Sequence, residues 1–147
     1  MADTFETLFS ALGTMASQGR LLRGSDAADD YRADESLTVA ARVPAAVAIP
    51  RSTEEVSQIL AVCAAGGIPV TGRGAGTGLS GAAVPREDGL VVSFEAMNAI
   101  LEIDTENHVA VVQPGIRLNE LDDALAIALQ VAAEASVKTA AVGEPRL

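Results

Sequence analysis

The sequence has little of the chemistry that many classes of protein require. Its 147 residues include one cysteine, Cys63, and one histidine, His108, so we predict neither a disulfide framework nor a metal site. Ten basic residues stand against 20 acidic ones, which gives a net charge of −10. A sequence-independent grip on nucleic acid needs clustered lysine and arginine, so we expect no nucleic-acid partner.

Long apolar runs are missing as well. No stretch reaches the roughly 20 apolar residues of a membrane-spanning helix. The N-terminus lacks the basic, apolar and small-residue order of a signal peptide, because the acidic Asp3 and Glu6 come first. We therefore expect no membrane span and a cytoplasmic location. Aliphatic residues dominate a 49% hydrophobic composition, which is enough to bury the core of one ordinary domain.

The apolar pattern predicts short strands alternating with helices. An amphipathic helix is expected from about Asp3 to Leu22, and a polar surface loop from Gly24 to Glu35. Further strands are expected at 45–49, 68–71, 89–94, 100–103 and 109–113, and further helices at 52–66 and from 118 onward. This order predicts an α+β fold, with a mixed sheet of short strands flanked by helices, and not a regular βαβ series. We predict an N-terminal helix over 1–25 and a partial ligand-binding domain over 26–147.

Local signals support several of these boundaries. Ser52 and Glu55 form a capping box at the start of the second long helix, and the pair Gly66-Gly67 is suited to its end. The short polar link at 104–108 predicts a hairpin between the last two strands. His108 lies in that link, and we interpret it as a solvated turn residue.

Half of the ten residues that follow the second predicted strand are glycine. This glycine loop reads Gly72-Arg73-Gly74-Ala75-Gly76-Thr77-Gly78-Leu79-Ser80-Gly81. Glycine at this density lets the backbone adopt positive φ and approach a ligand without Cβ interference. Successive N–H groups can then converge on the oxygens of a phosphate. We predict a phosphate site of this kind, with hydroxyl donors from Thr77 and Ser80 and a cation, Arg73, near its rim.

Two familiar phosphate motifs do not fit the glycine loop. Residues 76–81 match G-x-G-x-x-G formally, but a Rossmann loop must open a helix whose N-terminus faces the pyrophosphate. Residues 82–89 read instead as turns before a strand. A Walker A loop is excluded because no Gly-Lys-Ser/Thr occurs. The glycine loop is therefore predicted to hold its ligand by its backbone, between two strands.

Several separated motifs together resemble a known family. They are Pro50-Arg51-Ser52-Thr53-Glu54-Glu55-Val56, the run 69–81 and Val112-Gln113-Pro114-Gly115, with further likeness at 31–34 and 97–104. In order and spacing they resemble the PCMH-type FAD-binding domain of the vanillyl-alcohol oxidase/p-cresol methylhydroxylase family. Within it, the likeness is to the FAD-binding subunit of glycolate oxidase and to D-lactate dehydrogenases. The resemblance covers roughly residues 26–129.

The resemblance implies a cofactor and a site for it. The loop from Arg73 to Gly81 would wrap the pyrophosphate of FAD, and Pro114-Gly115 would lie near the cofactor. The implied cofactor-binding residues are Arg73, Gly74, Ala75, Gly76, Thr77, Gly78, Leu79, Ser80, Gly81, Pro114 and Gly115. Some members of the family bond the flavin covalently to a histidine in or beside this loop. This loop contains none, so noncovalent FAD is expected.

The implied reaction is oxidation of a small 2-hydroxy acid, of the glycolate or D-lactate type, by the flavin. After residue 129 the sequence departs from the family's pattern, because a second glycine-rich loop and a substrate domain do not follow. Two interpretations stay open. The chain is either a fragment of such an enzyme, which another chain could complete, or a non-catalytic module that binds a nucleotide or a partner. We favour the fragment, name no catalytic residue and expect no turnover by this chain alone.

Overall fold

The computed structural model describes residues 2–142, and the side chains of residues 4–134. The chain divides into two compact units, residues 1–97 and 98–147. The eleven elements of the described chain follow in order: α1 (Ala2–Ala11), α2 (Gly13–Ser17), β1 (Leu21–Arg23), η1 (Asp29–Arg32), β2 (Ala46–Ala48), α3 (Thr53–Gly66), β3 (Val70–Arg73), β4 (Leu90–Ser93), β5 (Ile100–Asp104), β6 (Val109–Val112) and α4 (Leu118–Val142). No helix of the described chain is long and apolar enough to cross a membrane.

The first unit is built on a four-stranded sheet of order β1-β2-β4-β3. β1 runs antiparallel to β2, whereas β2 and β3 both run parallel to β4. The mixed sheet that the sequence predicted is confirmed. Because α3 connects two strands that both run parallel to β4, the unit contains one split βαβ crossover, with β4 inserted between its strands.

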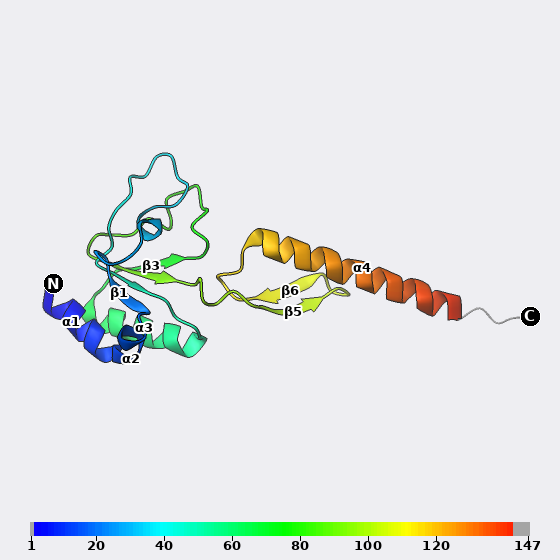
Figure 1. Ribbon diagram of the computed structural model, residues 1–147, viewed down its shortest axis with the longest axis horizontal. Coiled ribbons are helices and arrows are strands. Elements are labelled where there is room, and N and C mark those ends of the chain that lie inside the picture. The colour runs from blue at the N-terminus through cyan, green and yellow to red at the C-terminus, as the bar shows by residue number, and fades with distance from the viewer. Residues whose placement is uncertain (1, 143–147) are drawn as a thin grey trace, which may run out of the picture. The chain divides into compact units, whose positions relative to one another are not determined.

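Side chains of the two central strands alternate between two apolar layers. Ala46 and Ala48 of β2, with Leu90 and Val92 of β4, pack in one buried cluster with residues of α1, α2 and α3. Val47 and Val91 point to the opposite face and pack with Tyr31 of η1. Figure 1 shows the three helices on one side of the sheet. Both faces are covered, which explains why these strands read as continuous apolar runs.

The single N-terminal helix predicted over 3–22 is wrong in its extent. It ends at Ala11, a short second helix ends at Ser17, and Leu21–Arg23 is strand β1. Gly19 turns the chain with φ of 68°, after which β1 pairs with β2. Strand pairing therefore overrides a helical pattern that does place the buried side chains of Leu8 and Met15 correctly.

The predicted caps of α3 are confirmed in part. The Ser52 hydroxyl accepts a hydrogen bond from the N–H of Glu55 at 3.2 Å, and Gly67 ends the helix with φ of 63°. The return half of the capping box is wrong, because the Glu55 carboxylate accepts from the N–H of Arg51 and not from that of Ser52. Glu55 is displaced because it also pairs with Arg20.

The second unit consists of a hairpin and a helix. β5 and β6 pair antiparallel, with an irregular register between Ile100 and Glu102, and α4 contacts β5. The hairpin predicted from the link at 104–108 is confirmed. His108 is exposed in the turn with φ of 54°, in keeping with its interpretation as a solvated turn residue.

Candidate functional site

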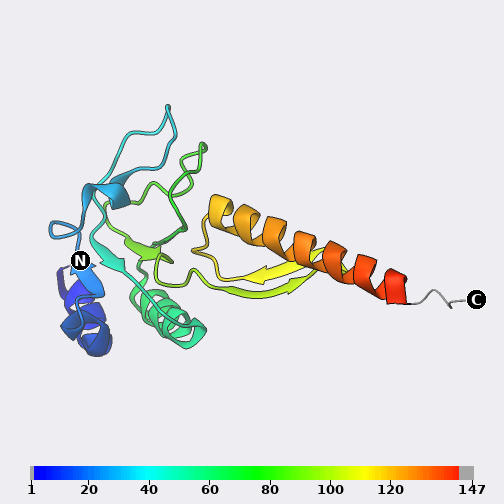
Figure 2. The same ribbon diagram turned by 45° about the vertical axis from the view of Figure 1, so that its right-hand side comes forward.

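The glycine loop leaves the sheet at the carboxyl end of β3, an edge where ligands of parallel sheets commonly bind. Residues 74–81 form bends without regular structure, and the chain returns through turns to β4 without a helix. The absence of a helix here agrees with the sequence argument against a Rossmann loop. Figure 1 and Figure 2 show the green loop rising beside the cyan segment around residue 40.

A second segment, residues 31–42, holds the glycine loop in place. The N–H of Glu35 donates to the carbonyl of Gly78 at 3.0 Å. The Asp34 carboxylate accepts from the N–H of Ala83 at 3.4 Å, and Val39 fills the space beside Gly81. We call residues 31–42 the bracing segment. These contacts give the glycine loop a defined conformation, so it is not merely a flexible connection.

Two glycines of the loop are required by its backbone. Gly76 has φ of 75° and Gly81 has φ of 78°, a region that L side chains rarely adopt. A Cβ on Gly81 would lie 2.4 Å from a methyl group of Val39. Gly78 does not have positive φ. A Cβ at Gly78 would meet only Asp34 Oδ2, at an ordinary 3.6 Å, so the protein itself does not require glycine at this position.

The backbone N–H donors of the glycine loop are not used within the described part of the protein. Within the described residues, none of the N–H groups from 74 to 82 donates a hydrogen bond to a protein atom, whereas those of Ala83 and Val84 do. Residues 77–80 are exposed, including the hydroxyl-bearing Thr77 and Ser80. An array of free N–H groups around a left-handed turn is the arrangement that binds anions.

Arg73 does not stand at the rim, where the sequence placed it. Its side chain is buried, and Nη1 donates to the carbonyl of Ala33 at 2.6 Å. Pro114 and Gly115 lie between β6 and α4 in the second unit, Pro114 exposed and Gly115 buried. Their closeness to the cofactor stays a prediction.

Sequence reasoning missed a polar cluster at the same edge of the sheet. The Tyr31 hydroxyl donates to the Glu95 carboxylate, 3.0 Å from both oxygens, and the buried Ser93 hydroxyl donates to Glu95 Oε2 at 3.0 Å. Burial, together with the hydrogen bond to Glu95, raises the pKa of Tyr31 to about 12. The one signal was the lone aromatic residue in an otherwise polar segment, which was interpreted as loop.

Tyr31 is the only tyrosine of a chain without tryptophan, which gives this cluster a clean optical readout. We expect the phenolate absorbance of the folded protein to titrate near pH 12, against about 10 for a free tyrosine. Since the folded pKa is raised, its stabilising effect is complete below about pH 10 and is lost between about pH 10 and 12. Glu95→Gln should lower the midpoint, while Glu87→Gln, an exposed change outside the cluster, should not. An unchanged midpoint in Glu95→Gln would contradict the coupling.

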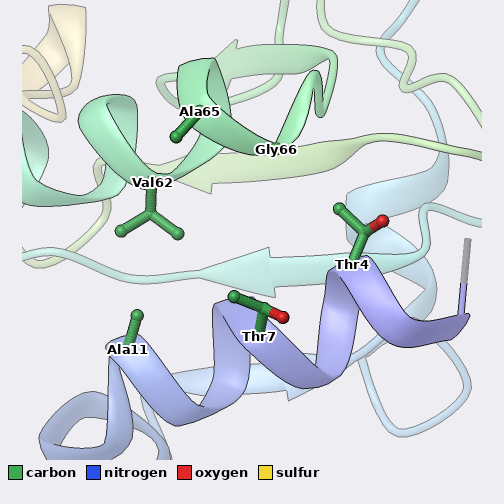
Figure 3. A pocket seen from close by; sticks show the side chains of 6 residues that line it. All are labelled: Thr4, Thr7, Ala11, Val62, Ala65 and Gly66. Atoms are coloured by element: carbon green, nitrogen blue, oxygen red, sulfur yellow. The ribbon is translucent and has the colours of Figure 1, made fainter.

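A groove lies between α1 and α3 in this unit. Figure 3 shows its lining of small side chains: Thr4, Thr7, Ala11, Val62, Ala65 and Gly66. The lining contains no charged side chain. It also lies at the end of α3 that precedes β3, away from the glycine loop. In the described chain, no group of three or more metal-ligating side chains is found.

Comparison with known proteins assigns the class of protein. Residues 44–143 match the family described as "FAD binding domain", so the chain belongs to that family. FAD is its cofactor, as the sequence predicted, and the glycine loop contains no histidine to which the flavin could be bonded. The predicted resemblance to the vanillyl-alcohol oxidase/p-cresol methylhydroxylase family is confirmed.

Particular relatives narrow the comparison. An uncharacterised FAD-linked oxidoreductase of Mycobacterium tuberculosis is 50% identical over 112 residues, 76% of this chain and 24% of the relative. Glycolate oxidase subunit GlcD of Bacillus subtilis is 44% identical over 69% of this chain and 20% of its own length. D-lactate dehydrogenase of Archaeoglobus fulgidus is 48% identical over 65% of this chain. The chain thus spans about a quarter of the length of the curated relatives that it matches.

Solved structures show the same fold. 4-Ethylphenol oxidase from Gulosibacter chungangensis superposes with a TM-score of 0.71 at 25% identity, covering 87% of this chain and 25% of that one. p-Cresol methylhydroxylase gives a TM-score of 0.65 at 24% identity, covering 84% of this chain, a likeness of fold alone. The predicted class, a PCMH-type FAD-binding domain, is therefore confirmed.

Proposed function

We propose that the glycine loop holds the pyrophosphate of FAD, and that the protein to which this domain belongs oxidises a small 2-hydroxy acid of the glycolate or D-lactate type. The observation that carries the first part is the row of N–H groups at 74–82 that donate to no described protein atom, around the left-handed turn at Gly76. Thr77 and Ser80 add exposed hydroxyl donors. The second part is supported by the identity to glycolate oxidase and D-lactate dehydrogenase relatives.

The residues of this chain contribute binding and orientation. Because glycine has no side chain, the backbone N–H groups of the loop can approach the phosphate oxygens closely. The protein carries a net charge of −10, which repels anions, so an anion needs such local donors in order to bind. When bound, FAD supplies the redox chemistry. Pro114 and Gly115 are proposed to lie near the cofactor, and we assign no catalytic residue to this chain.

Ligand preference tests this function. We expect FAD and ADP to bind with measurable heat in titration calorimetry and NAD to bind more weakly, because the site lacks a helix N-terminus for a dinucleotide of the Rossmann type. Stronger binding of NAD than of FAD or ADP would contradict the proposal.

A variant at Gly78 ties the ligand to the loop. Its φ is ordinary and its surroundings are open, so Gly78→Val should fold normally while its side chain stands in the way of the phosphate. We expect it to weaken FAD and ADP binding at least tenfold, about 1.4 kcal/mol. Unchanged affinity in a folded Gly78→Val protein would remove the glycine loop from the site.

A further inference from the structure

Arg73 is placed beneath the glycine loop and not in front of it. Its backbone belongs to β3, where it pairs with Ser93, and its carbonyl accepts from the N–H of Phe94 at 2.9 Å. Its side chain is 9% exposed, and Nη1 donates to the carbonyl of Ala33 in the bracing segment at 2.6 Å. One guanidinium thus joins the sheet to the segment that holds the glycine loop.

The same guanidinium occupies the place where residue 76 would carry a side chain. A Cβ built on Gly76 would lie 2.0 Å from Arg73 Nη2 and 2.3 Å from Cζ. The left-handed turn at Gly76 is therefore formed directly against the planar group of Arg73. A lysine side chain, with its flexible stem and compact ammonium group, could not present the same flat surface to Gly76 or the same fixed donor to Ala33.

The charge of Arg73 has no carboxylate partner among the described residues, in which four ion pairs are found and none includes Arg73. Its one hydrogen bond goes to a neutral carbonyl. The positive charge of Arg73 also lies close enough to Tyr31 to oppose the rise in the pKa of that phenol.

We propose that Arg73 is a positioning residue for the cofactor: it fixes the turn at Gly76 and the contact with Ala33, so that the N–H groups of the loop point at the phosphates, and it does not itself bind them. This inference rests on the proposed pyrophosphate role of the loop. It differs from the expectation of a rim cation, for which any positive charge at this position would serve.

The test compares three variants of the full chain in fluorescence titrations with FAD and calorimetric titrations with ADP. Arg73→Lys keeps the charge, Arg73→Met keeps much of the bulk, and Arg73→Ala leaves a space that added guanidinium ion can fill. Arg86→Met is the matched control, since Arg86 is exposed, pairs only with Asp88 and precedes the other end of β4. Circular dichroism tests whether each variant folds.

We expect all three Arg73 variants to lose affinity about tenfold or more, equivalent to about 1.4 kcal/mol. Low millimolar guanidinium should restore binding to Arg73→Ala, whereas ammonium should not, because only guanidinium has the planar shape against which the turn at Gly76 packs. Arg86→Met should bind as the unmodified chain does. If Arg73→Ala does not fold, Arg73→Lys decides: wild-type affinity in Arg73→Lys would overturn the positioning role.

The result also separates this inference from the function on which it rests. If the unmodified chain binds neither FAD nor ADP, or Gly78→Val binds as well as it does, the pyrophosphate role is wrong and the role of Arg73 falls with it. If the chain binds and Gly78→Val weakens binding, but the Arg73 variants bind normally or guanidinium restores nothing, only the positioning role is overturned.

Discussion

Replacing Gly76 by valine is expected to abolish cofactor binding and to destabilise the first unit. A β-branched residue at φ of 75° carries backbone strain of about 1–3 kcal/mol. Its Cβ would also displace the Arg73 guanidinium, and the charged hydrogen bond to Ala33 that would be lost contributes about 1.5–3 kcal/mol. With the turn broken, the N–H groups no longer converge, so FAD affinity should fall at least about a hundredfold.

Gly78→Val is the matched control for the Gly76 variant. Both changes place the same side chain in the glycine loop, but Gly78 lacks positive φ and has room for a Cβ. Urea unfolding should therefore show a loss of stability for Gly76→Val and almost none for Gly78→Val, while FAD titration shows weakened binding for both. Equal stabilities of the two variants would contradict the strain argument.

Replacing Arg20 by methionine is expected to destabilise the first unit strongly. Arg20 is 8% exposed and donates two 2.7 Å hydrogen bonds to Glu55, and Nη1 also donates to the carbonyl of Ile49. The pair ties the start of β1 to the first turn of α3. Removing one partner of a buried pair leaves the other charge uncompensated. Because Glu55 is a quarter exposed, we expect the free energy of unfolding to fall by about 2–4 kcal/mol.

Arg23→Met is the control, because it removes the same charge from an exposed pair. Arg23 and Glu6 are 49% and 65% exposed, and Arg23 also lies 4.7 Å from the ring of Phe9. Exposed ion pairs and cation–π contacts each contribute at most about 1 kcal/mol. Urea unfolding should rank Arg20→Met well below Arg23→Met in stability, and the opposite ranking would show that the pair with Glu55 is weak.

The Arg20 pair has a pH signature of known sign. Hydrogen bonds from Arg20 lower the pKa of Glu55 below its ordinary value, against the opposing effect of burial. A lowered folded pKa contributes stability above about pH 4.3, the ordinary value for glutamate, and that stability is lost as the pH falls through the folded pKa. The acid-dependent loss of stability should therefore be smaller in Arg20→Met than in the unmodified chain.

Much of this fold could be predicted from the sequence because local signals agree with the tertiary structure. The strand before Pro50, the cap at Ser52 and the glycines that end α3 are each specified by neighbouring residues. The end of the first helix could not be found in this way. Leu21 belongs to a strand because β2 lies beside it, and its partner there, Ala48, is 27 residues further along the chain.

The sequence predicts where the candidate site lies in the chain, but not its backbone conformation or the contacts that hold it. Glycine density and the preceding strand identify the loop, but the sequence does not tell which glycines have positive φ: Gly76 and Gly81 do, and Gly78 does not. The burial of Arg73 depends on Ala33, forty residues earlier in the chain. Contacts of this kind carry no local pattern, so the first part of the bracing segment, residues 31–35, was interpreted as surface loop.

The central position of β4 bears on how the unit assembles. β4 follows β2 and β3 in the chain but lies between them, so the parallel strands have no hydrogen-bonded contact with one another until β4 is inserted. Pairings at such long sequence separation are slow to form, since the entropy of closing the intervening chain is lost before any contact compensates it. The glycine loop belongs to the segment between β3 and β4, whose ends are brought together when β4 is inserted. Cofactor binding and completion of the sheet are therefore linked equilibria. Binding of FAD favours the completed sheet, and completion of the sheet favours binding.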